Sequence, residues 1–151
     1  MSPQGNCSLL GFLVFSQLMK VAIYGTGYVG LVAGVCLAKL GHQVICLDIN
    51  EVRIEKLSAN VCPIYEIKLD GLLTKNIASQ AIQFTSDFAL AANFGEIHLV
   101  CVGTPSLETG KADLTAVLSV TQSIVFELKH DATIVTKSTV PVSTGKVTIL
   151  R

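Results

Sequence analysis

Short apolar runs alternate with longer amphipathic segments from Lys20 onwards, which is the pattern of βαβ units. Five runs have the length of strands and are rich in Val, Ile and other residues that favour strands. They cover residues 21–24, 44–47, 82–84, 97–102 and 133–136. Strands covered on both faces are apolar along most of their length, as these runs are. The pattern therefore predicts an α/β fold with a doubly wound parallel sheet as the middle of three layers.

Helix-length segments fill the intervals between these runs. They are expected at about residues 28–40, 50–59, 69–78, 87–92 and 113–129, with a further helix starting at Ser143. Gly41 is placed to end the first helix, and Asn50 is placed to cap the second. Asn60 follows the second helix and is expected in the left-handed conformation, which asparagine tolerates better than most residues.

The first eighteen residues do not fit this alternation. A polar segment, residues 1–8, is followed by an apolar segment, residues 9–15, of signal-peptide length. No Lys or Arg precedes the apolar segment and no small-residue cleavage site follows it, so a secretory signal is disfavoured. We expect residues 1–18 to form an extension outside the fold and residues 19–151 to form one domain.

Composition narrows the class of protein. Half of the residues are hydrophobic and 15% are charged, which is too apolar for a disordered chain. Eleven basic residues balance eleven acidic ones and no basic run occurs, so neither nucleic acid nor an anionic membrane is an expected partner. No apolar stretch reaches the roughly 18 residues of a membrane span.

The five cysteines are widely spaced and include no C-x-x-C pair. They are Cys7, Cys36, Cys46, Cys62 and Cys101. This usage is typical of a reducing compartment, so we expect a cytoplasmic protein with neither a disulfide framework nor a metal site. Cys36, Cys46 and Cys101 lie in apolar runs and are expected to be small buried residues.

A glycine-rich motif joins the first strand to the first helix. Residues 25–30 read Gly-Thr-Gly-Tyr-Val-Gly, the G-x-G-x-x-G pattern of dinucleotide-binding folds. In that pattern Gly25 makes the tight turn, Gly27 lets a pyrophosphate approach the backbone, and Gly30 lets helix and strand pack closely. Asp48 ends the second strand, eighteen positions after Gly30, as the pattern requires. We therefore predict a Rossmann-type domain with strand order 3-2-1-4-5 that binds NAD.

Asp48 also indicates which dinucleotide is bound. A carboxylate there would accept hydrogen bonds from the adenosine ribose and repel a 2′-phosphate, which favours NAD over NADP. Arg53, five residues later, could receive a 2′-phosphate, line the adenosine pocket, or simply be a solvated charge. We expect the acid to decide the preference.

Two further segments follow strands at the edge of the sheet where ligands bind. Gly103-Thr104-Pro105 follows the fourth strand, and Ser138-Thr139-Val140-Pro141 follows the fifth. Their amides and hydroxyls would face the nicotinamide half of the cofactor. The same residues are also common in ordinary turns, and this second interpretation stays open.

These motifs together resemble the N-terminal part of the UDP-glucose 6-dehydrogenase family, which oxidises a sugar C6 alcohol to a carboxylate with two NAD. The resemblance covers residues 19–151. It rests on residues 20–31, Asp48 with Arg53, Pro63-Ile64-Tyr65-Glu66, Val102-Gly103-Thr104-Pro105-Ser106, Ala112-Asp113-Leu114 and Lys137-Ser138-Thr139-Val140-Pro141-Val142.

The resemblance implies roles for individual residues. The amides of Tyr28 and Val29 would meet the pyrophosphate, Thr104 would lie beside the nicotinamide, and Thr139 would position a water near the reacting carbon as a supporting catalytic residue. The whole expected cofactor-binding set is Gly25, Thr26, Gly27, Tyr28, Val29, Gly30, Asp48, Arg53, Val102, Gly103, Thr104, Ser138 and Thr139.

The chain also departs from the family pattern. Ile67-Lys68 stands where the family usually has Pro-Gly, and Ser143 replaces a glycine. The sixth strand, the sugar-binding domain and the catalytic cysteine and lysine of the family would lie beyond Arg151. We therefore expect the chain to bind NAD without turnover, with a nucleotide sugar as the substrate of the full-length enzyme.

Two other functions stay open. The chain could derive from a GDP-mannose or UDP-N-acetylmannosamine dehydrogenase, since the sugar is chosen outside this domain, or it could be a non-catalytic NAD-binding module. An unpaired fifth strand at the edge of the sheet also predicts a homo-oligomer.

Overall fold

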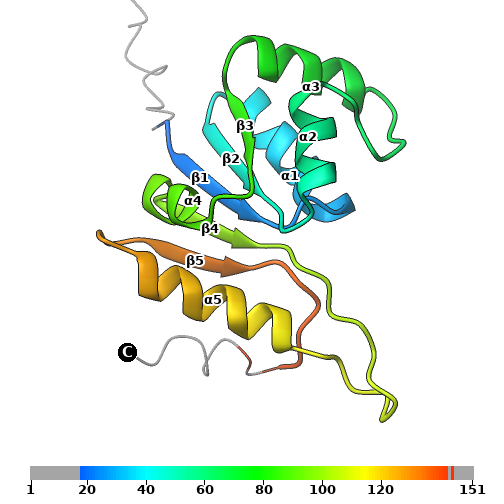
Figure 1. The fold of residues 1–151 in the computed structure, drawn as a ribbon, viewed down its shortest axis with the longest axis vertical. Helices are drawn as coiled ribbons and strands as arrows, with labels where there is room; N and C mark the ends of the chain where they lie inside the picture. The colour runs from blue at the N-terminus through cyan, green and yellow to red at the C-terminus, as the bar shows by residue number, and fades with distance from the viewer. Residues whose placement is uncertain (1–17, 143, 145–151) are drawn as a thin grey trace, which may run out of the picture.

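The computed structural model describes residues 18–142 and 144, and it contains a five-stranded parallel sheet (Figure 1). The strands are β1 (Lys20–Tyr24), β2 (Gln43–Leu47), β3 (Ile82–Thr85), β4 (Ile97–Val100) and β5 (Thr133–Thr136). Their order is β3-β2-β1-β4-β5, and every pair is parallel. The predicted fold class and strand order are confirmed.

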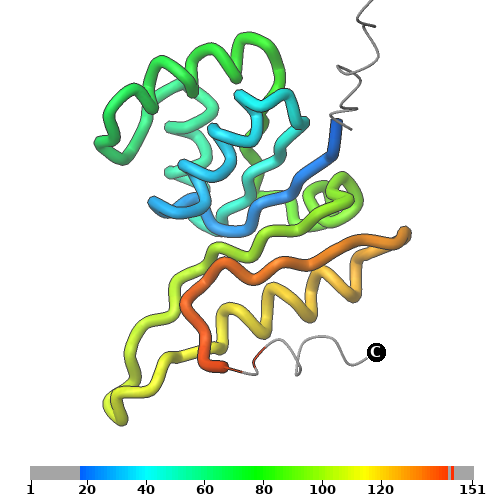
Figure 2. The backbone as a smooth tube through the Cα atoms, turned by 180° about the vertical axis from the view of Figure 1, so that it is seen from behind, coloured from blue at the N-terminus to red at the C-terminus, as the bar shows by residue number. Residues whose placement is uncertain are grey.

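Five helices cover the two faces of the sheet. They are α1 (Tyr28–Lys39), α2 (Glu51–Ser58), α3 (Leu69–Ala78), α4 (Phe88–Phe94) and α5 (Thr115–Glu127). Helices α1, α2 and α3 pack on one face, while α4 and α5 pack on the other, as the views from both sides show (Figures 1 and 2). The result is the three-layer arrangement that the alternating pattern predicts.

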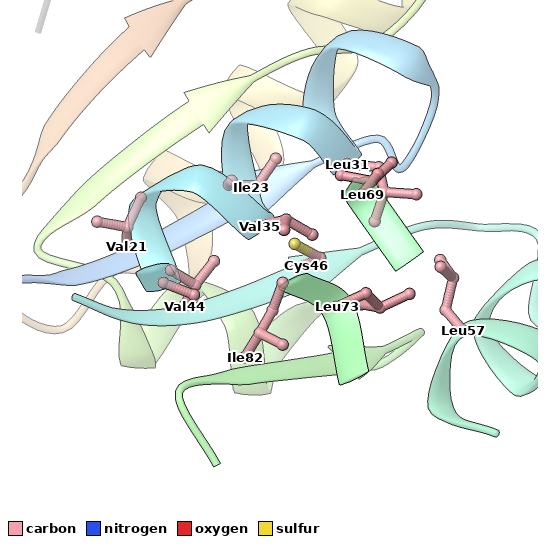
Figure 3. Close-up of a cluster of buried hydrophobic side chains, with 11 residues drawn as sticks. Val21, Ile23, Leu31, Val35, Val44, Cys46, Leu57, Leu69, Leu73 and Ile82 are labelled. Carbon is pink, nitrogen blue, oxygen red and sulfur yellow. The ribbon is translucent and has the colours of Figure 1, made fainter. Parts of the chain in front are cut away.

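The core on the first face is built from β1, β2 and β3 (Figure 3). Val44 and Cys46 of β2 point towards α1 and α3, where they meet Val35 and Leu73. Gly34 of α1 lets the helix approach the sheet, because a Cβ there would lie 2.7 Å from the Cys46 sulfur. Close packing at this point fixes the position of α1, and therefore of the loop that precedes it.

The core on the second face contains a polar pair. The Tyr24 hydroxyl and His98 Nδ1 lie 2.9 Å apart, and both side chains are fully buried. The Tyr24 ring also packs on Phe88 of α4, with the ring centroids 5.3 Å apart. Because a buried polar group without a partner is costly, this hydrogen bond stabilises the Tyr24 hydroxyl and His98 Nδ1 within an apolar layer.

Most turn signals adopt the expected geometry. Gly41 has φ +101° and Asn60 has φ +61°, both in the left-handed region, and the Asn50 side chain caps α2 by accepting from the amide of Arg53. Lys68 (φ +68°) and Gln80 (φ +57°) also adopt the left-handed conformation, which the sequence pattern did not predict. Lys68 stands where the resembling family has glycine, so the loop keeps the left-handed turn without the residue that favours it.

Two expectations need correction. Of the three cysteines expected to be buried, Cys46 is buried, Cys101 is only partly buried and Cys36 is exposed. Cys36 is exposed because the buried stripe of α1 runs through Leu31, Val35 and Ala38 and leaves it outside. The fourth strand ends at Val100 and not at residue 102, because its pairing with β5 ends at Val100 and Thr136. The helix expected from Ser143 and nearly all of the N-terminal extension lie outside the described residues.

Candidate binding site at the end of the central strands

The glycine turn directly follows β1 at the carboxyl end of the sheet. Gly25 has φ +98°, and its amide donates to the carbonyl of Leu47 at 2.8 Å. A Cβ on Gly25 would lie 2.9 Å from the carbonyl oxygen of Cys101, so any side chain there would strike the backbone that follows β4. The turn therefore packs closely between the ends of β2 and β4.

The other two glycines of the motif serve different purposes. A Cβ on Gly30 would lie 1.9 Å from the carbonyl oxygen of Gly25, so only glycine allows the helix to start this close to the turn. A Cβ on Gly27 would meet no atom within 4 Å, and the φ of Gly27 is −68°. Gly27 therefore borders open space, and nothing in the fold of the described residues requires a glycine there.

The N-terminus of α1 opens onto that space. Its N-cap residue, Gly27, supplies no side-chain cap, so the amides of the first turn have no partner from that source. The side chains of Tyr28 and Val29 are 57% and 45% exposed. Unpaired amides together with the positive end of the helix dipole form a site for a phosphate group.

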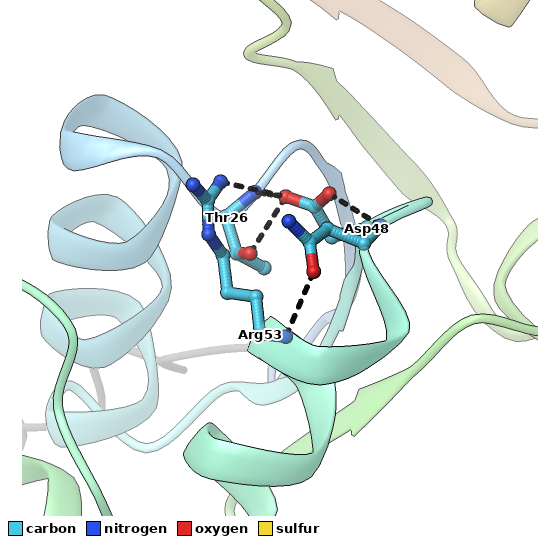
Figure 4. A network of polar contacts seen from close by, with 4 residues as sticks. Thr26, Asp48 and Arg53 are labelled. Atoms are coloured by element: carbon cyan, nitrogen blue, oxygen red, sulfur yellow. Dashed lines mark hydrogen bonds and ion pairs between the residues drawn. The ribbon is translucent and has the colours of Figure 1, made fainter.

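Asp48 joins the glycine turn to the start of α2 (Figure 4). One carboxylate oxygen, Oδ2, accepts from the Thr26 amide at 2.8 Å and from the Thr26 hydroxyl at 2.7 Å. The other oxygen, Oδ1, accepts from the Asn50 amide at 3.0 Å. Nη1 of Arg53 lies 3.4 Å from Oδ2, completing an ion pair in which the arginine side chain is 40% exposed.

The network keeps Asp48 ionised. Burial alone would raise the pKa of this carboxyl, but the amides of Asn50 and Thr26, the Thr26 hydroxyl and the charge of Arg53 together lower it below its ordinary value. Asp48 is therefore a fixed anion at the end of β2. It can accept further hydrogen bonds at Oδ1, which has a single partner among the described residues.

The segments after β4 and β5 meet at the other side of the glycine turn. The Ser138 hydroxyl donates to the carbonyl of Val102 at 2.6 Å, which ties the two segments together. Gly103 has open space where a Cβ would be, Thr104 is partly buried, and Thr139 is exposed. Neither threonine hydroxyl bonds to another described residue, so both can serve a ligand.

The expected site residues thus lie in two groups. The first contains the glycine turn, Asp48 and Arg53, and the second contains residues 102–104 with Ser138 and Thr139. Gly25 connects them, because it contacts Leu47 on one side and Cys101 on the other. The Ser138 hydroxyl bonds within the chain, as do the Thr26 hydroxyl and Arg53, which both bond to Asp48.

One contact at the site had no signal in the sequence. The hydroxyl of Tyr28, the first residue of α1, donates to the Glu66 carboxylate, 38 residues later in the chain. Glu66 lies in the loop between α2 and α3, so this loop borders the open end of α1. Tyr28 and Glu66 are 38 residues apart, so no local sequence pattern could have indicated the contact.

Other surface features lie away from this site. An open hollow of about 590 Å³ is lined by Phe88, Gln122, Ser123, Phe126 and Glu127, all from α4 and α5. In the part of the chain that the structure describes, no three His, Cys, Asp or Glu residues gather as metal ligands would. None of the helices in residues 18–142 is long and apolar enough to span a membrane.

Comparison with known proteins decides the family. Residues 19–151 match the model of the "UDP-glucose/GDP-mannose dehydrogenase family, NAD binding domain". The chain belongs to this family. The part it matches is the family's NAD-binding domain, and the uncapped end of α1, the open space beside Gly27 and the fixed anion at Asp48 fit that cofactor.

Individual relatives agree with this assignment. UDP-glucose 6-dehydrogenase TuaD of Bacillus subtilis is 46% identical over 129 residues, which is 85% of this chain and 28% of the relative. The solved UDP-glucose dehydrogenase of Pyrobaculum islandicum has a TM-score of 0.82 at 31% identity, covering 87% of this chain and 31% of that one.

A relative that acts on a different sugar nucleotide has the same fold. The GDP-mannose dehydrogenase of Pseudomonas aeruginosa, solved as a ternary complex, has a TM-score of 0.81 at 34% identity, covering 85% of this chain and 30% of that one. The chain spans less than a third of the length of each of these relatives.

Proposed function

We propose that this chain is the NAD-binding part of a UDP-glucose 6-dehydrogenase, which oxidises UDP-glucose to UDP-glucuronate with two NAD. The observation that carries the proposal is Asp48, held ionised beside an uncapped helix N-terminus in a domain of this family. The relative TuaD of Bacillus subtilis, a UDP-glucose 6-dehydrogenase, supports UDP-glucose as the substrate of the full-length enzyme.

The first group of residues would hold the adenosine diphosphate half of NAD. The pyrophosphate would lie against the amides of Tyr28 and Val29, in the open space beside Gly27. Asp48 would accept from the ribose hydroxyls through Oδ1, and Arg53 would border the adenosine. Gly25, Thr26 and Gly30 would act indirectly, because they set the shape of the turn and fix the carboxylate.

The second group would face the nicotinamide. NAD supplies a hydride acceptor there, and the chain's own residues would orient it and limit access of water. Val102, Gly103 and Thr104 would contact the nicotinamide side, with Ser138 supporting them through its bond to Val102. Thr139 is a supporting catalytic residue that would position a water, since a hydroxyl without an adjacent base is a poor nucleophile.

The chain itself would bind NAD without turning it over. Among the described cysteines, burial raises the pKa of Cys46, Cys62 and Cys101, so these thiols are poorly suited to attack a substrate. None of the five cysteines stands in the sequence context of the family's catalytic cysteine. Sustained NAD reduction by the pure chain with UDP-glucose would contradict this part of the proposal.

Calorimetric titration with NAD tests the binding itself. Wild-type chain should bind saturably, and Asp48→Ala should weaken binding by about tenfold or more, because the ribose loses its acceptor and the turn loses its anchor. Asp131→Ala is the matched control, since Asp131 is exposed and lies two residues before β5, at the amino end of that strand. Absence of binding by a folded wild-type chain would overturn the proposal.

Assembly and compartment complete the proposal. Strand β5 is unpaired on one side within the described residues, and Val135 is 42% exposed, so we expect self-association through that edge. A strictly monomeric species at high concentration in the ultracentrifuge would contradict this.

The four described cysteines are free thiols, which supports a cytoplasmic location. The boundary at residue 19 stays a prediction.

A further inference from the structure

The contact between Tyr28 and Glu66 links two segments that the sequence keeps far apart. Tyr28 is the first residue of α1, and Glu66 belongs to the loop of residues 59–68 that joins α2 to α3. The Tyr28 hydroxyl donates to Oε2 of Glu66. No other side-chain hydrogen bond recorded for the described residues joins this loop to α1.

Glu66 differs from its neighbours in the loop. Tyr65 is 94% exposed and Ile67 is 76% exposed, so both side chains project into solvent. Glu66 is only partly exposed and lies between them, directed to α1. Its carbonyl also accepts from the Leu69 amide at 3.1 Å, and Leu69 is buried in the core. The backbone of Glu66 is therefore held by the start of α3, and its carboxylate by Tyr28.

Tyr28 needs such an anchor because α1 begins without a side-chain cap. The first turn of a helix frays when its amides are unsatisfied, and the N-cap residue here is glycine. A side chain held at the first helical position restrains the backbone of that residue. The amide of Tyr28 is one of the two that would face the pyrophosphate, so restraint there prepares the site before the ligand arrives.

We propose that Glu66 is a positioning residue for the cofactor, which acts by holding Tyr28 and with it the phosphate-binding turn of α1. This inference rests on the proposed function, since it concerns how the NAD site is organised. Glu66 does not touch the ligand in this scheme. The Glu66 carboxylate contributes a hydrogen-bond acceptor, and its negative charge is a disadvantage beside an anionic pyrophosphate.

The proposal is tested by titrating variants of the full chain with NAD. Tyr28→Phe removes the donor and Glu66→Ala removes the acceptor, so each should weaken binding by about three- to tenfold. The double variant should bind no more weakly than the weaker single variant, because both changes break the same contact. Glu66→Gln keeps an acceptor oxygen, and its affinity should stay within about twofold of wild type.

Two further readouts separate positioning from a general loss of structure. ADP-ribose, which has the pyrophosphate but no nicotinamide, should lose affinity by the same factor as NAD, while binding of adenosine should be unchanged. The bond to Glu66 also raises the pKa of Tyr28. In an absorbance titration, Glu66→Ala should return the pKa of Tyr28 to its ordinary value of about 10. Glu66→Gln should keep the pKa above that value, because the hydrogen bond persists.

Tyr65→Phe and Glu127→Ala are the matched controls, because they make the same two changes at side chains that form no hydrogen bond with another described residue. Unchanged NAD affinity in Tyr28→Phe and Glu66→Ala would overturn the positioning role, as would additive effects in the double variant. Equal losses for NAD and adenosine would also overturn it. A wild-type chain that does not bind NAD at all would instead refute the proposed function on which this inference rests.

Discussion

The carbonyl oxygen of Gly25 lies only 1.9 Å from the position that a Cβ on Gly30 would occupy. We expect Gly30→Ala to lower the free energy of unfolding by about 3 kcal/mol or more, because the clash is with backbone and cannot be relieved by a rotamer change. Urea denaturation of the purified variant would measure this. A loss below about 1 kcal/mol would contradict the close approach seen here.

Gly27→Ala makes the same change three residues earlier and should act on binding alone. Its Cβ would meet nothing, and its φ of −68° suits any residue, so stability should stay within about 0.5 kcal/mol of wild type. NAD affinity should nevertheless fall, because the methyl group occupies the space proposed for the pyrophosphate. If both affinity and stability were unchanged, the ligand would have to lie elsewhere.

Asp48→Asn should change the preference between the two dinucleotides. The substitution removes the negative charge that would repel a 2′-phosphate and frees Arg53 from its ion pair. The ratio of NAD affinity to NADP affinity should fall by about tenfold or more, measured by calorimetry with each cofactor. The double variant Asp48→Asn/Arg53→Met should lose the gain for NADP, and retention of that gain would exclude a role for the arginine.

Lys68→Gly should stabilise the chain. Lys68 is held at φ +68°, a conformation that costs a residue with a Cβ about 1–2 kcal/mol. Glycine avoids this strain, but its greater conformational freedom in the unfolded state cancels part of the gain. A gain of about 1 kcal/mol is expected by urea denaturation. Lys75→Gly, inside α3, is the matched control and should instead destabilise by a similar amount.

His98 should make stability depend on pH. Burial lowers the pKa of His98, with a smaller contribution from the charge of His130. The unfolded chain therefore binds a proton more readily than the folded one, and stability should fall as pH drops below about 6.5, the ordinary histidine value. Denaturation between pH 7.5 and 5.5 would show the slope. His98→Asn should flatten this slope, and an unchanged slope in that variant would contradict the role of His98.

Local patterns were enough to predict the sheet and to bring Asp48 next to the glycine turn. Apolar runs gave five strands, and the interval from Gly30 to Asp48 placed an acid at the end of β2, where it meets Thr26. Backbone geometry determines which residues are accepted at these positions, so residue type and spacing in the sequence are enough to predict the local structure. Cys36 was predicted wrongly because the whole of α1 is apolar, although the spacing of Leu31, Val35 and Ala38 shows which face is buried.

Contacts between distant segments could not be predicted in this way. Nothing near Tyr28 or Glu66 in the sequence indicates that they meet, since the folding of α2 and the following loop brings them together. The inward bond of the Ser138 hydroxyl to Val102 likewise depends on the pairing of β4 with β5. Side chains that join separate elements are determined by tertiary packing, which a local pattern does not record.

The two halves of the sheet differ in how deeply they are buried, and their backbones should open to solvent at different rates. Four of the five residues of β2 are buried, whereas every residue of β5 is exposed or only partly buried. Amide protons of β1 and β2 should therefore exchange only when the whole domain unfolds, while those of β5 should exchange through local openings. The segment that carries Thr139 would then open to solvent more often than the half of the molecule proposed to bind adenosine, which should stay rigid.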